Sequence, residues 1–375
     1  MDLISYAMAK KYSVQRLNHF GFNLNNALLE FRIALANRTA TPCEIVCLGD
    51  SIVEGEYTSD KPNMAWASVL RKLLQSRFGD AGEGWIGALE GAGLPGSNPR
   101  VAFGTGWGLA AGTKSGFGGT YATSNGALTS MTVNFTGDKI NIIHAKGSAG
   151  GTANVLVDGT NVGTINCNAA TISFGNVVTF SGLTNAAHVL TITPQTSAAA
   201  MVEGVIVGKG SAGVRVHRVG YAGYKSGDWV NTNTQASWGV LPPHLTIIAL
   251  GVNDGGNNVN PAVYKANMEI IIQRYQALGA SVLLVPYGIS SSAWSTSTTY
   301  NWKSFVQTMY DLARKYNCGV VDVYAAWNKD YTWAQTRGLY GAATNDYTGA
   351  SGANSVHPGD KGHRYIAGIL ERHLI

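Results

Sequence analysis

The 375-residue sequence predicts an α/β fold: a parallel sheet covered by helices, into which an all-β unit of sandwich or jelly-roll type is inserted. Two observations lead to this prediction. Short apolar runs alternate with segments of helical period near both ends of the chain, as in parallel α/β sheets. Between them, residues 101–212 hold only seven charged side chains and several runs of period-two alternation, which is typical of antiparallel strands. We therefore expect an N-terminal helical arm at 1–40, a discontinuous α/β domain at 41–95 and 214–375, and an inserted β domain at 96–213.

The first α/β segment begins with a helical pattern. Residues 22–37 place apolar side chains at helical spacing, which predicts a helix. Residues 44–48 form a short apolar run that ends at Gly49 and predict a buried strand. Residues 64–78 return to the helical period. A strand followed by a helix is the repeating unit of a parallel sheet.

The inserted segment is predicted to consist of strands. Asp158-Gly159 lies between two alternating runs and predicts a two-residue hairpin, because a type I′ turn needs positive φ at both central residues. Alternating runs at such short spacing indicate a β-sandwich or jelly roll. The predicted strands include residues 131–135, 140–143, 154–157, 189–192 and 202–207.

After residue 214 the mixed pattern resumes. The apolar run 245–250 fits a strand buried in a parallel sheet. Further strands are predicted at 281–285 and 319–323, and helices at 261–278, 300–316 and 360–373.

The composition excludes several classes of protein. Hydrophobic residues make up 45% of the chain, too much apolar surface for a disordered segment. The 47 glycines follow no three-residue period, which excludes collagen. Charged residues make up only 13%, against about 25% in a typical soluble domain. The net charge of +5 is spread thinly and forms no basic stripe, so we expect no nucleic-acid partner.

The sequence also gives expectations about compartment. It has no apolar stretch of about 18 residues, so no membrane insertion is expected. Asp2 stands where a signal peptide needs a basic residue, so we expect the chain to be made without one. Cys43 and Cys47 lie about 13 Å apart along one predicted strand, too far for a disulfide. We therefore expect synthesis in a reducing compartment, with the thiols as small core residues.

Three segments fall at the carboxyl ends of predicted strands or before the last helix, where sheets of this kind place their sites. Ser51 follows the first strand and could present its Oγ and its own N–H to one space; an N-cap serine is the alternative. Asn253 follows the 245–250 strand and could aim its amide at an oxyanion; a turn-forming Asn-Asp pair is the alternative. His357, held extended before Pro358, could take a proton from Ser51. Two further residues of this last segment are given structural roles, Asp360 as a helix N-cap and His363 inside the helix.

Together these segments resemble the blocks of the SGNH, or GDSL-type, hydrolase family, in the family's order. Gly49-Asp50-Ser51 is similar to the nucleophile block, residues 219–223 to the glycine block, residues 251–254 to the asparagine block, and His357-Pro358 to the histidine block. The resemblance implies a flavodoxin-like three-layer fold and a serine nucleophile. It also implies an oxyanion hole made by Ser51, Gly223 and Asn253, with Gly220 as a rival to Gly223.

One position departs from the family pattern. The family usually carries an aspartate three residues before the histidine, where this chain has Asn354. Without that carboxylate the imidazolium formed during catalysis loses its ionic partner. Three interpretations remain open: a Ser–His dyad oriented by Asn354 or by a backbone carbonyl, another acid such as Asp346 in its place, or a change that reduces activity.

The inserted segment resembles the carbohydrate-binding jelly rolls attached to some sugar O-acetyl esterases, on residues 154–159 and 187–192. That resemblance implies a unit that faces a glycan; a purely structural domain or an oligomer interface is the alternative. Aromatic rings suit the apolar faces of sugars, so Trp85 and Trp229 beside the glycine-rich loops are candidate substrate-binding residues, with core packing as the alternative.

Residues 4–12 resemble segments near the start of phage and prophage tail proteins. This implies a virion or extracellular protein and, by analogy, a homotrimer. Taken together, the resemblances imply a serine esterase that deacetylates an O-acetylated cell-surface polysaccharide, with no cofactor and no metal. The alternatives are an esterase of lipid or other acyl chains and a non-catalytic glycan-binding tail module with a decayed esterase core.

Overall fold

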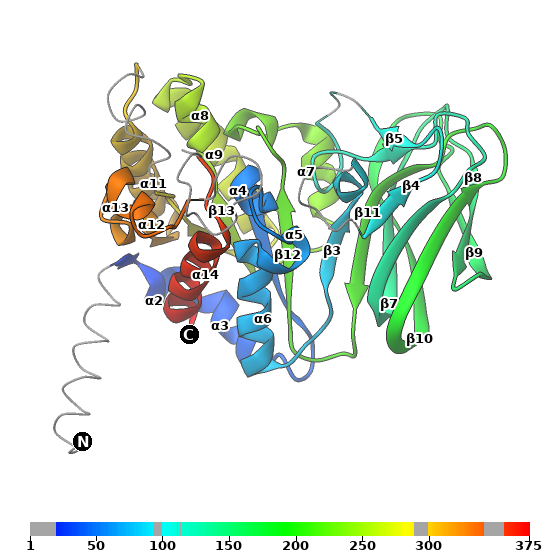
Figure 1. The fold of residues 1–375 in the computed structure, drawn as a ribbon, viewed down its shortest axis with the longest axis horizontal. Coiled ribbons are helices and arrows are strands. Elements are labelled where there is room, and N and C mark those ends of the chain that lie inside the picture. The colour runs from blue at the N-terminus through cyan, green and yellow to red at the C-terminus, as the bar shows by residue number, and fades with distance from the viewer. Residues whose placement is uncertain (1–19, 93–99, 111, 113, 289–298, 341–355) are drawn as a thin grey trace.

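The structure is a computed structural model that describes residues 20–92, 100–110, 112, 114–288, 299–340 and 356–375. Within these residues the strands form two sheets, one of six strands and one of nine. Figure 1 shows the six-stranded sheet and its helices on one side of the molecule and the nine-stranded sheet on the other. The α/β class predicted from the sequence is confirmed.

The six-stranded sheet is parallel except at one edge. Its order is β1-β15-β14-β13-β2-β12, and only β1 runs antiparallel to its neighbour. Gly49, at the end of β2, pairs with Gly220 on β12 and with Ala249 on β13. The three segments that follow these residues therefore start side by side. The strands are β1 (Gly21–Phe22), β2 (Cys43–Gly49), β12 (Val214–Gly220), β13 (Leu245–Ala249), β14 (Ser281–Leu284) and β15 (Gly319–Val321).

Both faces of this sheet are covered. Side chains alternate between faces along a strand, yet every residue of β13 and β14 is buried. Helix α6 packs against α14, and α9 packs against α11. The helices include α2 (Leu24–Ala27), α3 (Leu29–Ala36), α4 (Ser51–Glu54), α5 (Lys61–Met64), α6 (Trp66–Phe78), α7 (Thr232–Trp238), α8 (Val252–Gly256), α9 (Pro261–Ala277), α11 (Trp302–Tyr316), α12 (Val323–Ala326), α13 (Tyr331–Gln335) and α14 (Asp360–Leu374).

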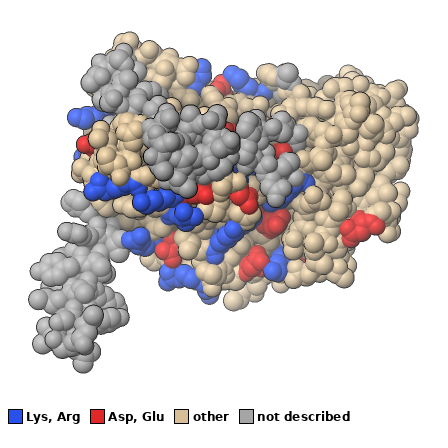
Figure 2. Space-filling model, viewed as in Figure 1, with Lys and Arg blue, Asp and Glu red and all other residues tan. Residues whose placement is uncertain are grey.

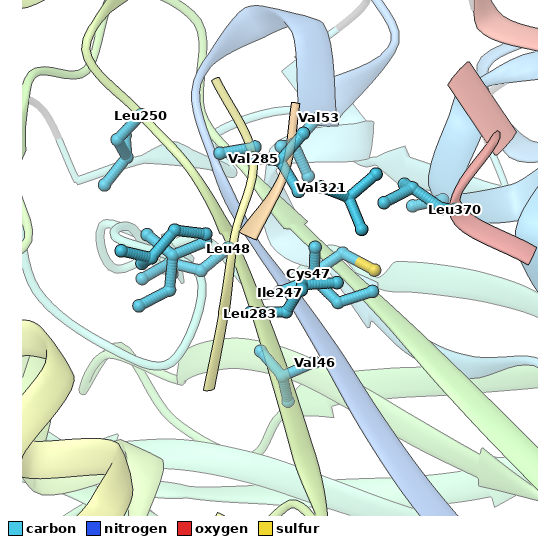
Figure 3. Close-up of a cluster of buried hydrophobic side chains, with 14 of the residues drawn as sticks. Val46, Cys47, Leu48, Val53, Ile247, Leu250, Leu283, Val285, Val321 and Leu370 are labelled. Carbon is cyan, nitrogen blue, oxygen red and sulfur yellow. The ribbon is translucent and has the colours of Figure 1, made fainter. Parts of the chain in front are cut away.

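The core of this part is made by apolar strand residues. Cys47, Ile247 and Leu283, from three neighbouring strands, are fully buried and lie together on one face of the sheet, whereas Leu48 lies on the other face (Figure 3). All four cysteines are free and buried, and burial raises the pKa values of their thiols. They serve as small core residues, as the sequence predicted.

The nine-stranded sheet is antiparallel throughout and has a second hydrophobic core. Residues 131–135 and 140–143, predicted as separate strands, lie on one long strand that pairs with β10 along most of its length. The predicted hairpin at Asp158-Gly159 joins β8 to β9, with φ of 50° and 79° at its two central residues. The strands are β3 (Gly84–Gly87), β4 (Val101–Phe103), β5 (Gly108–Leu109), β6 (Ala122–Thr123), β7 (Met131–Lys146), β8 (Thr152–Val157), β9 (Thr160–Asn166), β10 (Ser173–Pro194) and β11 (Met201–Gly208).

The boundary between the two sheets falls before residue 84. Strand β3 pairs with β11 in the antiparallel sheet, although its residues lie inside the stretch 41–95 predicted for the α/β domain. Trp85, Phe117, Ile143 and Ile206 belong to the same hydrophobic cluster as the parallel sheet. The division into domains stays a prediction, but the two sheets share buried side chains.

The described part of the predicted N-terminal arm packs on the α/β core. Strand β1 pairs with β15, and Leu28 and Phe31 are completely buried. The predicted helix 22–37 is two helices, α2 and α3, with a break at Leu28. Residues 1–19, with their resemblance to tail proteins, lie outside the described residues. Among those that are described, no helix is long and apolar enough to span a membrane.

Candidate active site

Ser51 is the first residue of α4, directly after β2 ends. The helix is capped by Asp50, whose carboxylate accepts a hydrogen bond of 2.9 Å from Ile52 N. The alternative interpretation of Ser51 as the N-cap is therefore excluded, and its hydroxyl is available for other contacts. Burial raises the pKa of Asp50 to about 7. The carboxyl beside the serine is thus a weaker anion at neutral pH than an exposed aspartate, which limits its repulsion of negative charge developing nearby.

His357 meets Ser51 from the far end of the chain. Its Nε2 lies 2.8 Å from Ser51 Oγ, a hydrogen-bond distance. The imidazole stacks on Tyr57, with ring centroids 4.8 Å apart and planes 14° from parallel. Burial lowers the pKa of His357 to about 4, so the ring is neutral at neutral pH and can accept a proton. Asn354 and Asp346, the candidate orienting residues, lie outside the described residues.

Gly220 at the end of β12 and Gly223 in the loop that follows are the two candidate glycines for the oxyanion hole, and their surroundings differ. Gly220 packs against α4: a Cβ placed there would lie 2.3 Å from Glu54 N and 2.7 Å from Asp50 O. Gly223 has φ of +79°, and a Cβ on it would meet no described atom within 4 Å. Gly220 is thus needed for close approach, whereas Gly223 has a turn conformation that faces open space.

Asn253 is placed by α8, which begins after β13 on the other side of β2 from Gly223. Its Nδ2 donates a hydrogen bond of 2.9 Å to the carbonyl oxygen of Tyr224. The next residue, Asp254, accepts hydrogen bonds from the N–H and hydroxyl of Ser226. The Asn-Asp pair therefore ties the glycine loop to α8, a function beyond the turn that was its alternative interpretation.

The two candidate sugar-binding tryptophans have different positions. Trp229 is completely buried and packs between Tyr224 and Trp238, so its prediction as a substrate-binding residue is wrong and core packing is correct. Trp85 is also buried, with 4% of its surface exposed, and it packs on Phe117, but it lines a cavity where the two sheets meet. Its indole Nε1 lies beside Gly87 and Gly118 of the same cavity. The sequence shows only that both residues are tryptophans near glycine-rich loops, and this does not tell which of them lines a cavity.

Two further predictions concern the last helix. His363 is completely buried and accepts a hydrogen bond from Trp66 N, the structural role expected for it. Asp360 lies inside α14, not at its N-cap, and accepts hydrogen bonds from the N–H and hydroxyl of Ser59. Within the described parts of the chain, no three His, Cys, Asp or Glu side chains come together as a metal site would require.

Three residues of the site were not found from the sequence. Tyr57 covers the imidazole of His357. Glu54 accepts a hydrogen bond of 2.7 Å from Ala222 N, and Lys61 forms a buried ion pair with Glu54. The only signal for Glu54 was its position one helical turn after Ser51, and nothing in the pattern singled out Tyr57 or Lys61.

Comparison with known proteins agrees with this geometry. The model of the GDSL-like lipase/acylhydrolase family matches residues 184–365, which include Gly223, Asn253 and His357 but not Ser51. The hydrogen bond between Ser51 and His357 places Ser51 beside the matched part of the chain. No match was found among curated protein sequences.

The fold is also found in solved structures. A structure described as a peptidoglycan O-acetylesterase in action has a TM-score of 0.72 at 19% identity, over 94% of this chain and 97% of that one. A Bacillus subtilis protein, YxiM, matches at TM-score 0.36 and 15% identity, over 70% of this chain and 86% of its own. An acetyl xylan esterase matches at TM-score 0.33 and 18% identity, over 42% and 78%. The first match shows that both sheets occur together in one known fold. Residues 184–365 thus match the GDSL-like lipase/acylhydrolase family, and the fold of the chain is similar to that of the first of these solved structures.

Proposed function

We propose that this protein is a serine esterase that removes O-acetyl groups from a cell-surface polysaccharide. The observation that carries the proposal is the 2.8 Å contact between Ser51 Oγ and His357 Nε2 at the carboxyl end of the parallel sheet. A serine hydroxyl becomes a nucleophile when an adjacent base can take its proton. The neutral imidazole of His357 is such a base.

The chemistry follows from these positions. Ser51 Oγ attacks the acetyl carbonyl carbon while His357 takes its proton, and the carbonyl oxygen becomes an oxyanion. The N–H groups of Ser51 and Gly223 and the Asn253 amide are the proposed donors to that oxyanion. One N–H of Asn253 already bonds Tyr224 O, which leaves its second N–H for the oxyanion. The imidazolium of His357 then gives its proton to the departing sugar oxygen, which leaves as the free hydroxyl, and the acetyl group stays on Ser51. Water, deprotonated by the same imidazole, then attacks the acetyl-Ser51 ester and releases acetate, and the proton returns to Ser51 Oγ.

The choice of an acetylated glycan rests on two supports. The structure with TM-score 0.72 over nearly the whole chain is described as a peptidoglycan O-acetylesterase. Residues 101–212 carry only seven charged side chains, and sugars offer uncharged hydroxyls and apolar ring faces. Peptidoglycan bearing O-acetyl groups is therefore the first glycan to test.

We further propose that Trp85 contributes to glycan binding. It lies in the cavity between the sheets, whose wall also contains Glu54 and Gly220. Glu54 is the last residue of the helix that begins with Ser51, so the cavity borders the nucleophile's helix. A sugar reaching from Ser51 toward the second sheet would meet this wall.

The test is acetate release by the wild type, Ser51→Ala and Asn354→Asp. The substrates are 4-nitrophenyl acetate, O-acetylated peptidoglycan and acetylated xylan. We expect release by the wild type, and a loss of about 10⁴-fold or more in Ser51→Ala, the scale seen when a nucleophile is removed. Release that does not depend on Ser51 would contradict the proposal.

Asn354→Asp separates the second candidate, a glycan-binding module with a decayed esterase core, which the asparagine at that position favours. A wild type without activity that gains it in Asn354→Asp would support that candidate. A wild type active on 4-nitrophenyl esters of long acyl chains and inactive on both glycans would instead indicate a lipid esterase.

A further inference from the structure

We propose that Glu54 is a positioning residue for the oxyanion hole: its carboxylate, held by Lys61, fixes the loop that carries the Gly223 N–H. The inference rests on the proposed function and extends it to a side chain that does not touch substrate. It follows from hydrogen bonds on both sides of Gly223.

The first hydrogen bond comes from the nucleophile's own helix. Glu54 is the last residue of α4, one turn after Ser51, and its side chain is 4% exposed. Its Oε2 accepts a hydrogen bond of 2.7 Å from the N–H of Ala222, the residue before Gly223. A single short helix therefore carries both the nucleophile and the group that anchors the oxyanion loop.

The second hydrogen bond lies on the other side of Gly223. The carbonyl oxygen of Tyr224 accepts the 2.9 Å hydrogen bond from Asn253 Nδ2. A Cβ on Gly223 would meet no atom of the described residues within 4 Å, so packing against those residues does not hold it. The direction of its N–H is therefore set by the tethers on its two neighbours, and Glu54 supplies one of them.

The Glu54 carboxylate is itself fixed by buried partners. Its Oε1 lies 2.8 Å from Lys61 Nζ, and the Lys61 side chain is 5% exposed. Its main-chain oxygen accepts a hydrogen bond of 2.5 Å from Arg218, which also contacts Glu90 at 2.6 Å. A buried carboxylate needs such pairing, because an unpaired charge in this setting is strongly destabilising. Lys61 thus pairs with the carboxyl group and holds the tether in one position.

The expected effect is on the transition state. In Glu54→Gln the side chain keeps its size, but its amide presents an N–H to one of the two donors, Lys61 or Ala222. We expect kcat on 4-nitrophenyl acetate to fall by about 10- to 100-fold, less than the 10²–10³ of deleting an oxyanion donor. KM should stay within about threefold, because the oxyanion contact forms only in the transition state. Glu54→Asp, which keeps the charge but is one methylene shorter, should show a similar loss.

A matched control separates positioning from stability. Glu44 is also paired, with His217 and Arg215, and its side chain is only 12% exposed, but it lies at the opposite end of β2 from Ser51. Glu44→Gln should lower the melting temperature and leave kcat unchanged. The concentration of competent sites in every variant is titrated with phenylmethanesulfonyl fluoride, so that kcat refers to folded molecules only.

A second readout uses an alkyl boronic acid, which forms a tetrahedral adduct with the serine and places an oxygen in the oxyanion hole. Its inhibition constant should rise in Glu54→Gln by the factor by which kcat/KM falls, and stay constant in Glu44→Gln. The inference is overturned if Glu54→Gln and Glu54→Asp keep kcat per titrated site within about twofold, or if Glu44→Gln loses as much. An inactive wild type would instead contradict the proposed function.

Discussion

At the scale of single residues, burial determines what His357 can do. The imidazole lies between Tyr57 and Ser51, where its charged form loses hydration, and this lowers its pKa to about 4. A histidine in water has a pKa of about 6.5 and is half protonated in mildly acidic medium. His357 instead remains a base over the whole mildly acidic range.

This gives a prediction for pH dependence. Only neutral His357 can accept the Ser51 proton, so kcat/KM should fall as pH decreases through about 4, the value for the folded protein, and not through about 6.5. The measurement is hydrolysis of 4-nitrophenyl acetate from pH 3 to 8, with acetate release followed by a method independent of the nitrophenol.

Tyr57→Ala provides the comparison for that profile. The substitution exposes one face of the imidazole to water, which favours its charged form and raises its pKa. The pH at which kcat/KM falls should therefore move upward from about 4 toward 6.5. If kcat/KM of the wild type already fell between pH 6 and 7, burial would not be what determines the pKa of His357.

The residue scale also shows where sequence reasoning succeeds and fails. The pairing of Ser51 with His357 could be predicted because both occur in short blocks with a fixed order. Tyr57 and Glu54 could not, because each acts through a partner distant in the chain and neither belongs to a recognised block. The sequence left substrate binding and core packing open for Trp229, because local composition does not tell which side of a loop faces the core.

At the scale of elements, the sequence patterns predicted whether a segment is a strand or a helix better than they predicted where each element begins and ends. The run 245–250 and the helix 261–278 were located within one residue of their observed ends. Residues 136–139, which include a glycine and two charged residues, were assigned to neither of the predicted strands 131–135 and 140–143. The chain continues extended there because pairing with β10 supplies the backbone partners that a turn would otherwise need.

The hairpin between β8 and β9 supports a prediction at this scale. Its two central residues have positive φ, and a Cβ on Gly159 would meet no described atom within 4 Å. The loss in Gly159→Ala should therefore come from the backbone alone, about 1 to 2 kcal/mol in the free energy of unfolding. The measurement is urea unfolding of the wild type and of Gly159→Ala. Activity on 4-nitrophenyl acetate should be the same in both.

Gly108→Ala is the matched control for the hairpin. Gly108 also has open space at its Cβ position but no positive φ. It should change the free energy of unfolding by much less than Gly159→Ala. Equal losses in the two variants would show that the turn conformation is not the cause.

At the scale of the whole molecule, the two sheets are joined by shared hydrophobic packing. Phe117, Ile143 and Ile206 come from the inserted segment but belong to the core cluster of the parallel sheet. Charge patterning predicted a β insert, but it could not show this shared core, because side chains that contact across a boundary look apolar in either domain.

Removal of the insert should therefore damage the α/β part. A chain in which a short Gly/Ser linker replaces residues 88–208 would leave Trp85 and its neighbours without cover. We expect loss of cooperative urea unfolding, and binding of the dye ANS to the uncovered surface. Cooperative unfolding with a kcat on 4-nitrophenyl acetate equal to that of the full chain would contradict the shared core.

The distribution of charge over the molecule has a consequence for the conditions in which it can act. On the face drawn in Figure 2, acidic and basic side chains gather over the α/β part, and the surface formed by the insert is almost free of them. Attraction between exposed charges is screened beyond about 8 Å at physiological ionic strength, whereas contacts of aromatic faces and hydroxyl groups are not. A neutral glycan held by the insert would therefore bind almost equally well in dilute fresh water and in brine.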